Sequence, residues 1–225
     1  MKYLLDTANL EDIERYQEYF PIAGVTSNPT IVKKEGSIDF FLHMKQIRTL
    51  IGVDKSLHIQ VTAKDFDGMM QDAESILNKI DENVFIKVPV TLDGIRVIKS
   101  LKMQSIHATA TAIYTTQQGF LAMEAGADYI APYYNRMENS NINPREVISS
   151  FSAMIEKYDY PTKILAASFK NAGQIDQAFL AGAQTVTIDP AILVEALKMP
   201  SILKAESDFT RDWTEIYGEK NISQL

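Results

Sequence analysis

The sequence contains no cysteine. That absence excludes disulfide bonds, iron–sulfur clusters, thiolate zinc sites and a cysteine nucleophile. Basic residues are also in deficit, because 22 Lys and Arg stand against 29 Asp and Glu, which gives a net charge of −7 at pH 7. Nucleic acids and anionic membrane surfaces are bound through a basic field, so we expect neither as a partner and favour small soluble ligands.

Long apolar runs are missing as well. No stretch approaches the roughly 18 apolar residues of a membrane-spanning helix, and Asp6 interrupts the short apolar run at the N-terminus. We therefore expect no signal peptide, no membrane association and a cytoplasmic location. Hydrophobic residues at 46% and charged residues at 23% are typical of a globular chain that can build a packed core.

What the chain does have is a repeated alternation of short apolar runs and longer amphipathic stretches. The runs predict strands at residues 3–6, 22–26, 57–62, 84–89, 106–113, 128–132, 163–168 and 184–188. The stretches have a 3.6-residue period and predict helices at residues 10–19, 40–51, 67–80, 94–102, 116–125, 144–157, 171–180 and 190–197. Eight such units without a linker predict a single α/β domain, a (β/α)8 TIM barrel.

The ends of the repeated units and the C-terminal tail refine this prediction. Gly126 and Gly182 each stand in an Ala-Gly-Ala phrase between a helix and a strand, where glycine suits a left-handed C-cap. We place the barrel at residues 1–199 and a C-terminal helical extension of the same domain at residues 200–225. The extension carries Phe209, Trp213 and Ile216 at helical spacing, and its apolar face can pack on its own barrel or on a neighbouring subunit.

Polar residues end seven of the eight predicted strands, and in this fold the chemistry collects at those ends. They are Asp6, Thr26, Asn28, Gln60, Lys87, Thr111, Tyr133, Arg136, Ser168 and Lys170. Single members have structural alternatives: Asp6 or Ser168 can cap the next helix, and Asn28 can initiate the turn at Pro29. Convergence from seven strands favours an active site.

Lys87 is the strongest candidate for a catalytic group. Alternation along its predicted strand turns Phe85, Lys87 and Pro89 into the barrel. A buried lysine loses its proton easily, and the neutral amine can attack a carbonyl to form a Schiff base. The alternative is a buried ion pair with Asp6.

Uncharged proton donors and acceptors flank this lysine on the neighbouring strands. Gln60, Thr111 and Tyr133 can move the protons that Schiff-base chemistry requires, and Tyr133 is the best acid or base among them. The alternative for Tyr133 is an aromatic filler at the rim of the barrel.

Arg136, Ser168 and Lys170 follow the sixth and seventh strands and predict a phosphate site. The alternative is a solvated Lys170 and an Arg136 paired with Glu138.

Metal and nucleotide sites have no support in the sequence. The three histidines, His43, His58 and His107, lie on separate predicted elements without the spacing or the carboxylates of a zinc site, and no glycine-rich nucleotide motif is present. We therefore expect no metal and no cofactor, and interpret His58 and His107 as core histidines low in the barrel.

Several segments, in order along the chain, resemble the transaldolase family of class I aldolases and, within it, the short fructose-6-phosphate aldolase branch. They are L-D-T at 5–7, G-V-T-S-N-P at 24–29, F-I-K-V-P-V at 85–90, A-P-Y-Y-N-R at 131–136 and L-A-A-S-F at 165–169. The resemblance extends from about Leu4 to Trp213. It implies a (β/α)8 enzyme that acts on sugar phosphates and small ketones or aldehydes through a Schiff base, without a cofactor.

The resemblance also implies a role for each matched residue. Lys87 would form the Schiff base, Asp6 would orient substrate hydroxyls and assist proton transfer, and Asn28 would bind the ketone. Arg136 and Ser168 would bind the phosphate, and we assign Thr26 and Lys170 to substrate binding beside them. It further implies a homo-oligomer, a pentamer or a decamer of two stacked rings, in which the C-terminal helix reaches a neighbour.

Two departures from true transaldolases point to the aldolase branch. Gln60 stands where transaldolases usually carry Glu, and Tyr133 where they usually carry Phe. Lys170 stands where many transaldolases place a second phosphate-binding arginine, and a lysine lacks the bidentate fork. The leading hypothesis is reversible cleavage of fructose 6-phosphate to dihydroxyacetone and glyceraldehyde 3-phosphate. The alternatives are a transaldolase and a catalytically silent sugar-phosphate-binding barrel.

Overall fold

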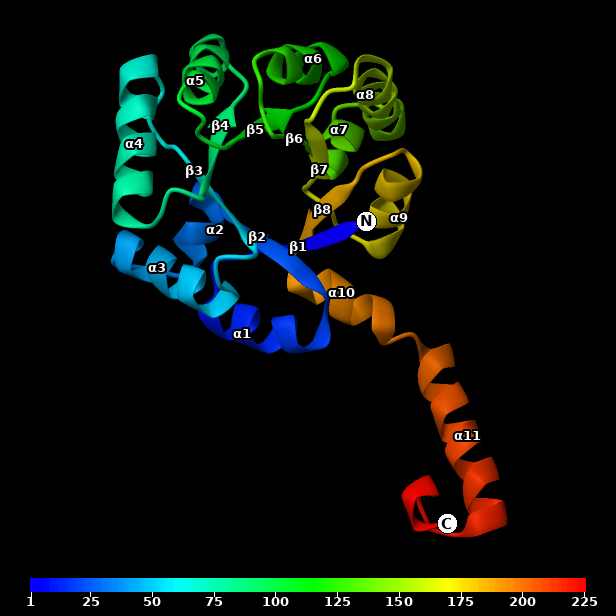
Figure 1. Ribbon diagram of the computed structural model, residues 1–225. Coiled ribbons are helices and arrows are strands. Elements are labelled where there is room, and N and C mark those ends of the chain that lie inside the picture. The colour runs from blue at the N-terminus through cyan, green and yellow to red at the C-terminus, as the bar shows by residue number, and fades with distance from the viewer. The chain divides into compact units, whose positions relative to one another are not determined.

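Eight short parallel strands close into a barrel, in which each strand pairs with the next along the chain and β8 pairs with β1 (Figure 1). The computed structural model describes all residues from Met1 to Leu225. The strands are β1 (Lys2–Asp6), β2 (Ile22–Thr26), β3 (Ser56–Gln60), β4 (Phe85–Pro89), β5 (Ala108–Ile113), β6 (Tyr129–Pro132), β7 (Lys163–Ala166) and β8 (Thr185–Ile188). The closed parallel barrel with intervening helices confirms the predicted (β/α)8 fold.

Long helices connect the strands and surround them in Figure 1. They are α1 (Leu10–Tyr19), α3 (Phe40–Ile51), α4 (Phe66–Lys79), α5 (Leu92–Met103), α6 (Thr116–Glu124), α8 (Pro144–Tyr158) and α9 (Ala172–Leu180). After β8 the chain forms α10 (Pro190–Leu197), α11 (Pro200–Tyr217) and a 3₁₀ turn at Ile222–Gln224. Each of these α-helices overlaps a segment that the amphipathic period predicts.

Two further helices, α2 (Pro29–Lys34) and α7 (Tyr134–Asn139), lie outside the sequence prediction. Each has six residues, fewer than two turns, so an apolar period has no room to show. α2 nevertheless has a local start signal, because Asn28 Oδ1 accepts a hydrogen bond from the Ile31 amide at 3.0 Å and Pro29 opens the helix. Both helices directly follow strands, β2 and β6.

The interior of the barrel contains a stacked aromatic layer below Lys87. Phe85 points inward from β4, as the alternation predicts, and its ring stacks on His58 at 4.6 Å and on His107 at 4.7 Å between centroids. His58 Nδ1 lies 2.8 Å from Thr109 Oγ1, and burial, followed by the positive charge of Lys87, lowers the pKa of His58 well below its usual value. His58 is therefore a neutral, hydrogen-bonded core residue, as expected from the sequence. The same expectation is wrong for His107, which is exposed and has Nδ1 3.6 Å from Asp128 Oδ1.

The glycines of the two Ala-Gly-Ala phrases have the left-handed backbone that the C-cap interpretation requires. Gly126 has a φ of 93° and Gly182 a φ of 104°. After α6, the Gly126 amide donates to Met123 O and the Ala127 amide donates to Ala122 O, which is the hydrogen-bond pair of a Schellman cap. A side chain at either position would be strained, so these glycines end the helices and start the return to the next strand.

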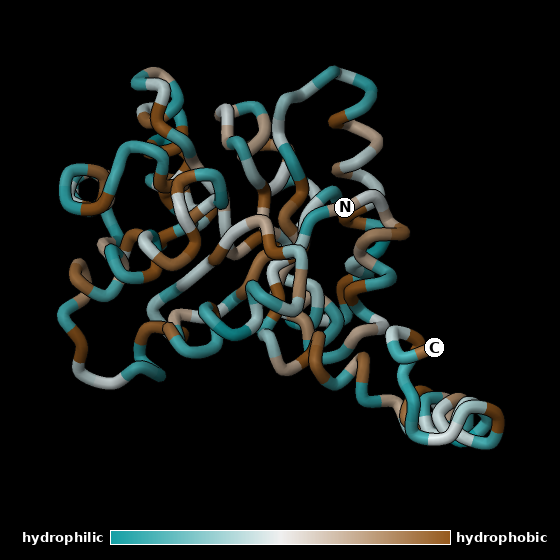
Figure 2. The backbone as a smooth tube through the Cα atoms, turned by 60° about the horizontal axis from the view of Figure 1, so that its bottom comes forward, coloured by the Kyte–Doolittle hydropathy of each residue, from teal (hydrophilic) through white to brown (hydrophobic).

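The core lies between the outer faces of the strands and the inner faces of the helices. Ile13, Met44, Ile98, Leu101 and Phe151 come from four different helices and are fully buried. Figure 2 shows the corresponding pattern, with hydrophobic and hydrophilic segments alternating along the helices. None of the helices is both long and apolar enough to cross a membrane.

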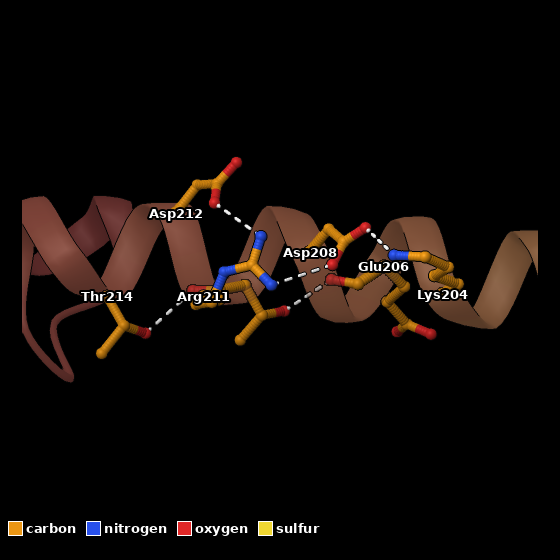
Figure 3. Close-up of polar contacts among 7 residues, drawn as sticks. Lys204, Glu206, Asp208, Arg211, Asp212 and Thr214 are labelled. Carbon is orange, nitrogen blue, oxygen red and sulfur yellow. Dashed lines mark hydrogen bonds and ion pairs between the residues drawn. The ribbon is translucent and has the colours of Figure 1, made fainter.

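The chain divides into two compact units, Met1–Pro190 and Ala191–Leu225. On α11 in the second unit, Asp208 accepts from Lys204 at 2.7 Å and from Arg211 at 3.0 Å (Figure 3). Ion pairs between residues three and four positions apart stabilise an exposed helix. The assignment of residues 200–225 to the same domain as the barrel stays a prediction.

Candidate active site

A cavity of about 170 Å³ lies at the carboxyl ends of the strands. All but one of the predicted site residues line it, namely Asp6, Thr26, Asn28, Lys87, Thr111, Tyr133, Arg136, Ser168 and Lys170. The exception is Gln60, which lines a neighbouring pocket. The strand order of the barrel therefore brings together residues that are up to 164 positions apart, from Asp6 to Lys170.

Lys87 projects from β4 into this cavity and is only 4% exposed. Its ammonium donates a hydrogen bond to Ser27 O at 2.8 Å. Burial lowers the pKa of Lys87, and the negative charge of Asp6 opposes that shift. No carboxylate forms an ion pair with it, so the predicted alternative of a Lys87–Asp6 pair is wrong, and burial makes the neutral amine easier to form than it is in water.

Asp6 is held instead by a chain of hydroxyl groups. Thr26 Oγ1 donates to Asp6 Oδ1 at 2.6 Å and lies 2.6 Å from Thr187 Oγ1. Because the Thr26 proton is used toward Asp6, Thr187 must be the donor to Thr26. Asp6 does not cap α1, since that role belongs to Asn9. The carboxylate is thus oriented at the cavity wall and can accept a proton or a substrate hydroxyl.

Tyr133 lies at the end of β6 with its hydroxyl 3.0 Å from Thr111 Oγ1 on β5. Burial raises the pKa of Tyr133, while the hydrogen bond from Thr111 lowers it in part. The phenol therefore stays protonated around neutral pH. It can act as a proton donor toward a group in the cavity, with the threonine hydroxyl as its relay.

The cationic side of the cavity is formed by Arg136, Ser168 and Lys170. The Arg136 guanidinium lies 4.8 Å from the centroid of the Tyr133 ring. The predicted alternative of an Arg136–Glu138 pair is wrong, because Glu138 Oε2 accepts from Gln174 instead. Arg136 and Lys170 are exposed and face the same cavity, which suits an anionic group of a ligand.

β7 ends at Ala166, two residues before the predicted end of that strand. Ser168, just beyond it, has a left-handed backbone with a φ of 65°. It does not cap α9, because Asn171 does. A non-glycine residue in this region is strained, and such strain is retained mainly where a side chain must take a defined place. Here the conformation sets Ser168 on the cavity wall beside Lys170.

A comparison with protein families identifies the family of this chain. The family model described as Transaldolase/Fructose-6-phosphate aldolase matches residues 3–222. The chain belongs to this family.

Individual relatives agree with that assignment. A Streptococcus pneumoniae protein named probable fructose-6-phosphate aldolase is 52% identical over 222 residues, which cover 99% of this chain and all of that protein. Among solved structures, inosine 5′-monophosphate dehydrogenase from Legionella pneumophila matches with a TM-score of 0.60 and 15% identity. That match covers 85% of this chain and 58% of the dehydrogenase chain, and it shows a shared barrel fold only.

Gln60 has an unexpected place relative to the cavity. Its backbone pairs with Lys87 in the β3–β4 ladder, yet its side chain lines the pocket that also contains Ser27, Asn28 and Phe40. Gln60 Oε1 is buried and has no hydrogen-bond partner within the chain. A buried acceptor of this kind is destabilising unless a donor reaches it, so the atom is suited to a water or a ligand hydroxyl.

The sequence analysis missed four polar residues that line the same cavity, Thr30, Lys34, Thr187 and Asp189. Thr187 lies near the end of β8 and carries the same strand-end signal as the residues that were predicted. Thr30 and Lys34 belong to α2, and without that helix the sequence does not place them over the barrel.

Proposed function

We propose that the protein is a class I aldolase that reversibly cleaves fructose 6-phosphate into dihydroxyacetone and glyceraldehyde 3-phosphate through a Schiff base on Lys87. The observation that carries this proposal is the state of Lys87, a nearly fully buried amine on the cavity wall that has a lowered pKa and no carboxylate partner. Membership of the transaldolase/fructose-6-phosphate aldolase family supports a sugar phosphate as substrate.

The reaction follows from a neutral amine beside a proton donor. The Lys87 amine adds to the C2 carbonyl of the open-chain sugar, and loss of water leaves an iminium ion. Removal of the C4 hydroxyl proton breaks the C3–C4 bond, releases glyceraldehyde 3-phosphate and leaves the electron pair in an enamine. Protonation of that enamine at C3, followed by hydrolysis, frees dihydroxyacetone and restores the amine.

The neighbouring groups have roles that suit these steps. The Tyr133–Thr111 pair supplies the proton that is needed for dehydration and for protonation of C3. Asp6, held by Thr26, lies on the same wall and is placed to accept substrate hydroxyl groups. Asn28 caps α2 with its Oδ1, which leaves its side-chain NH₂ to donate to a ketone-derived oxygen.

The phosphate of the substrate is assigned to the side of the cavity formed by Arg136, Ser168 and Lys170. Arginine and serine offer several donors, and two cations balance a dianion. In this arrangement the phosphate would lie away from Lys87. The reacting carbons of the substrate would lie beside the lysine.

A transaldolase is the second candidate. It shares the covalent intermediate but passes the dihydroxyacetone unit to another aldose phosphate. The observation that favours it is the place of Gln60, which lines the neighbouring pocket rather than the Lys87 cavity. A water held by Gln60 would then be less well placed to assist release of the intermediate.

The products formed by the wild-type protein test the proposal. An aldolase converts fructose 6-phosphate alone to equal amounts of dihydroxyacetone and glyceraldehyde 3-phosphate. A transaldolase releases little free dihydroxyacetone from either mixture, and with erythrose 4-phosphate it forms sedoheptulose 7-phosphate and glyceraldehyde 3-phosphate. A silent binding barrel gives no product with either mixture, and that result would overturn both enzymatic assignments.

We also propose that the protein is a cytoplasmic homo-oligomer. The support lies on α11, where Ile202, Phe209 and Ile216 lie on one apolar face, and Ile202 and Phe209 line a groove on the helix. A contiguous apolar face on a helix is stabilised when another surface covers it, and a second copy of the chain is always present at equal concentration.

A further inference from the structure

Tyr114 does not line the cavity but contacts two residues that do. Its ring meets the ring of Tyr133 edge-on, with 5.8 Å between centroids and 69° between planes. Its hydroxyl oxygen accepts a hydrogen bond from Arg136 Nη1 at 3.4 Å. Since the Arg136 guanidinium also lies over the Tyr133 ring, the three side chains form one mutually contacting cluster.

A backbone irregularity in β5 places Tyr114 on this side of the strand. Ala110 pairs with Ile130 and Ile113 pairs with Pro132, so β5 uses three residues where β6 uses two. Ala112 lies within this bulge and has a left-handed φ of 58°. In a regular strand Tyr114 would face opposite to Thr111, but one extra residue reverses the alternation and brings both side chains to Tyr133.

The contacts of Arg136 leave its charge available to a ligand. Arg136 is exposed, and no carboxylate pairs with it. A neutral hydroxyl and an aromatic face hold the guanidinium in place without neutralising it, whereas a carboxylate partner would compete with a phosphate. A long side chain held in advance also loses less conformational entropy on binding.

We propose that Tyr114 is a positioning residue that holds Arg136 against Tyr133 and thereby sets the phosphate-binding geometry relative to the proton donor. This inference rests on the proposed function, because it takes Arg136 as the phosphate ligand. Tyr114 itself does not line the cavity and acts through the two residues that it contacts.

The variant Tyr114→Phe tests the hydroxyl without removing the ring. We expect the KM for fructose 6-phosphate and the inhibition constant of inorganic phosphate to rise about tenfold, the effect of losing one hydrogen bond to a charged group. The kcat for aldol addition of dihydroxyacetone to unphosphorylated glyceraldehyde should change less than twofold. Tyr160→Phe is the matched control, since its hydroxyl bonds to Glu124, neither residue lines the cavity, and its loss should change neither constant.

A double-mutant cycle separates positioning from a general structural effect. If Tyr114 acts through Arg136, adding Tyr114→Phe to Arg136→Ala should cause no further rise in the KM for fructose 6-phosphate. Additive losses would overturn the proposal, as would an unchanged phosphate inhibition constant or equal losses with phosphorylated and unphosphorylated substrates. A wild-type protein that does not cleave fructose 6-phosphate would instead contradict the proposed function, before any variant is compared.

Discussion

The hydroxyl of Tyr133 lies 3.0 Å from that of Thr111, across the adjacent ends of β6 and β5. The two groups form an uncharged pair on the cavity wall that can both give and take a proton. Because burial raises the pKa of Tyr133, the phenol holds its proton and the pair is set to donate. After carbon–carbon cleavage, such a donor favours protonation and release of the bound dihydroxyacetone over its transfer.

Replacing Tyr133 with phenylalanine separates the two enzymatic hypotheses, because it removes only the hydroxyl. We expect release of free dihydroxyacetone to fall by roughly the 10²–10⁴-fold typical of a general acid or base. Transfer to erythrose 4-phosphate should fall less, or rise, because an incoming aldehyde captures the enamine that is no longer protonated. Both rates should be measured on one preparation. Equal losses in both would mean that Tyr133 supports the site without donating the proton.

Arg136→Ala should weaken the use of phosphorylated substrates selectively. The guanidinium faces the cavity beside Ser168 and Lys170, so its loss should raise the KM for fructose 6-phosphate by at least tenfold. Reaction of dihydroxyacetone with unphosphorylated glyceraldehyde should change much less. Arg145→Ala, at an exposed position of α8, is the control. If both substrate types lose equally, Arg136 has a structural role.

Ala112→Gly tests the strained bulge in β5. An L-residue in the left-handed region costs about 1 kcal/mol, and glycine removes that cost while making the unfolded chain more flexible. We expect the free energy of unfolding to stay unchanged or rise by up to about 1 kcal/mol. Ala110→Gly, in the regular part of the same strand, should lower it by about 1 kcal/mol. Denaturant unfolding of the two variants measures both changes. An equal loss of unfolding free energy in both would contradict the assignment of backbone strain to Ala112.

Much of this architecture could be predicted from the sequence because it depends on local patterns. The strand-and-helix alternation gave the barrel, and strand-end polarity gave the cavity residues around Lys87. The features that the sequence did not predict depend on geometry that no sequence pattern indicates. The helix α2 is too short for an apolar period, which hid Lys34, and the side chain of Gln60 turns into the neighbouring pocket.

Tyr114 illustrates the limit most clearly. Regular alternation from Thr111 predicts that it faces away from the site, and only the extra residue at Ala112 reverses it. A left-handed alanine has no sequence signature, because glycine and asparagine are the residues that normally mark such positions. The contact between Tyr114 and Arg136 is therefore visible only in the folded chain.

The apolar face of α11 leads to a prediction about assembly. Deleting residues 200–225 should lower the assembled mass in light scattering, because a self-association surface is removed. Phe209→Glu should have a similar effect, since a charge on the apolar face opposes its burial. Thr214→Glu, also on α11, is the matched control and should leave the mass unchanged. An unchanged mass for both the deletion and Phe209→Glu would place the contact elsewhere or exclude assembly through α11.

The central claim is that Lys87 forms the Schiff base, and borohydride trapping tests it most directly. Reduction in the presence of dihydroxyacetone should attach the reduced three-carbon unit to the peptide that contains Lys87, as read by mass spectrometry. Lys163→Met, an exposed residue at the start of β7, should keep the adduct and the turnover. Lys87→Met should remain folded and lose both. An adduct on a different lysine, or ordinary turnover in a folded Lys87→Met protein, would contradict the account.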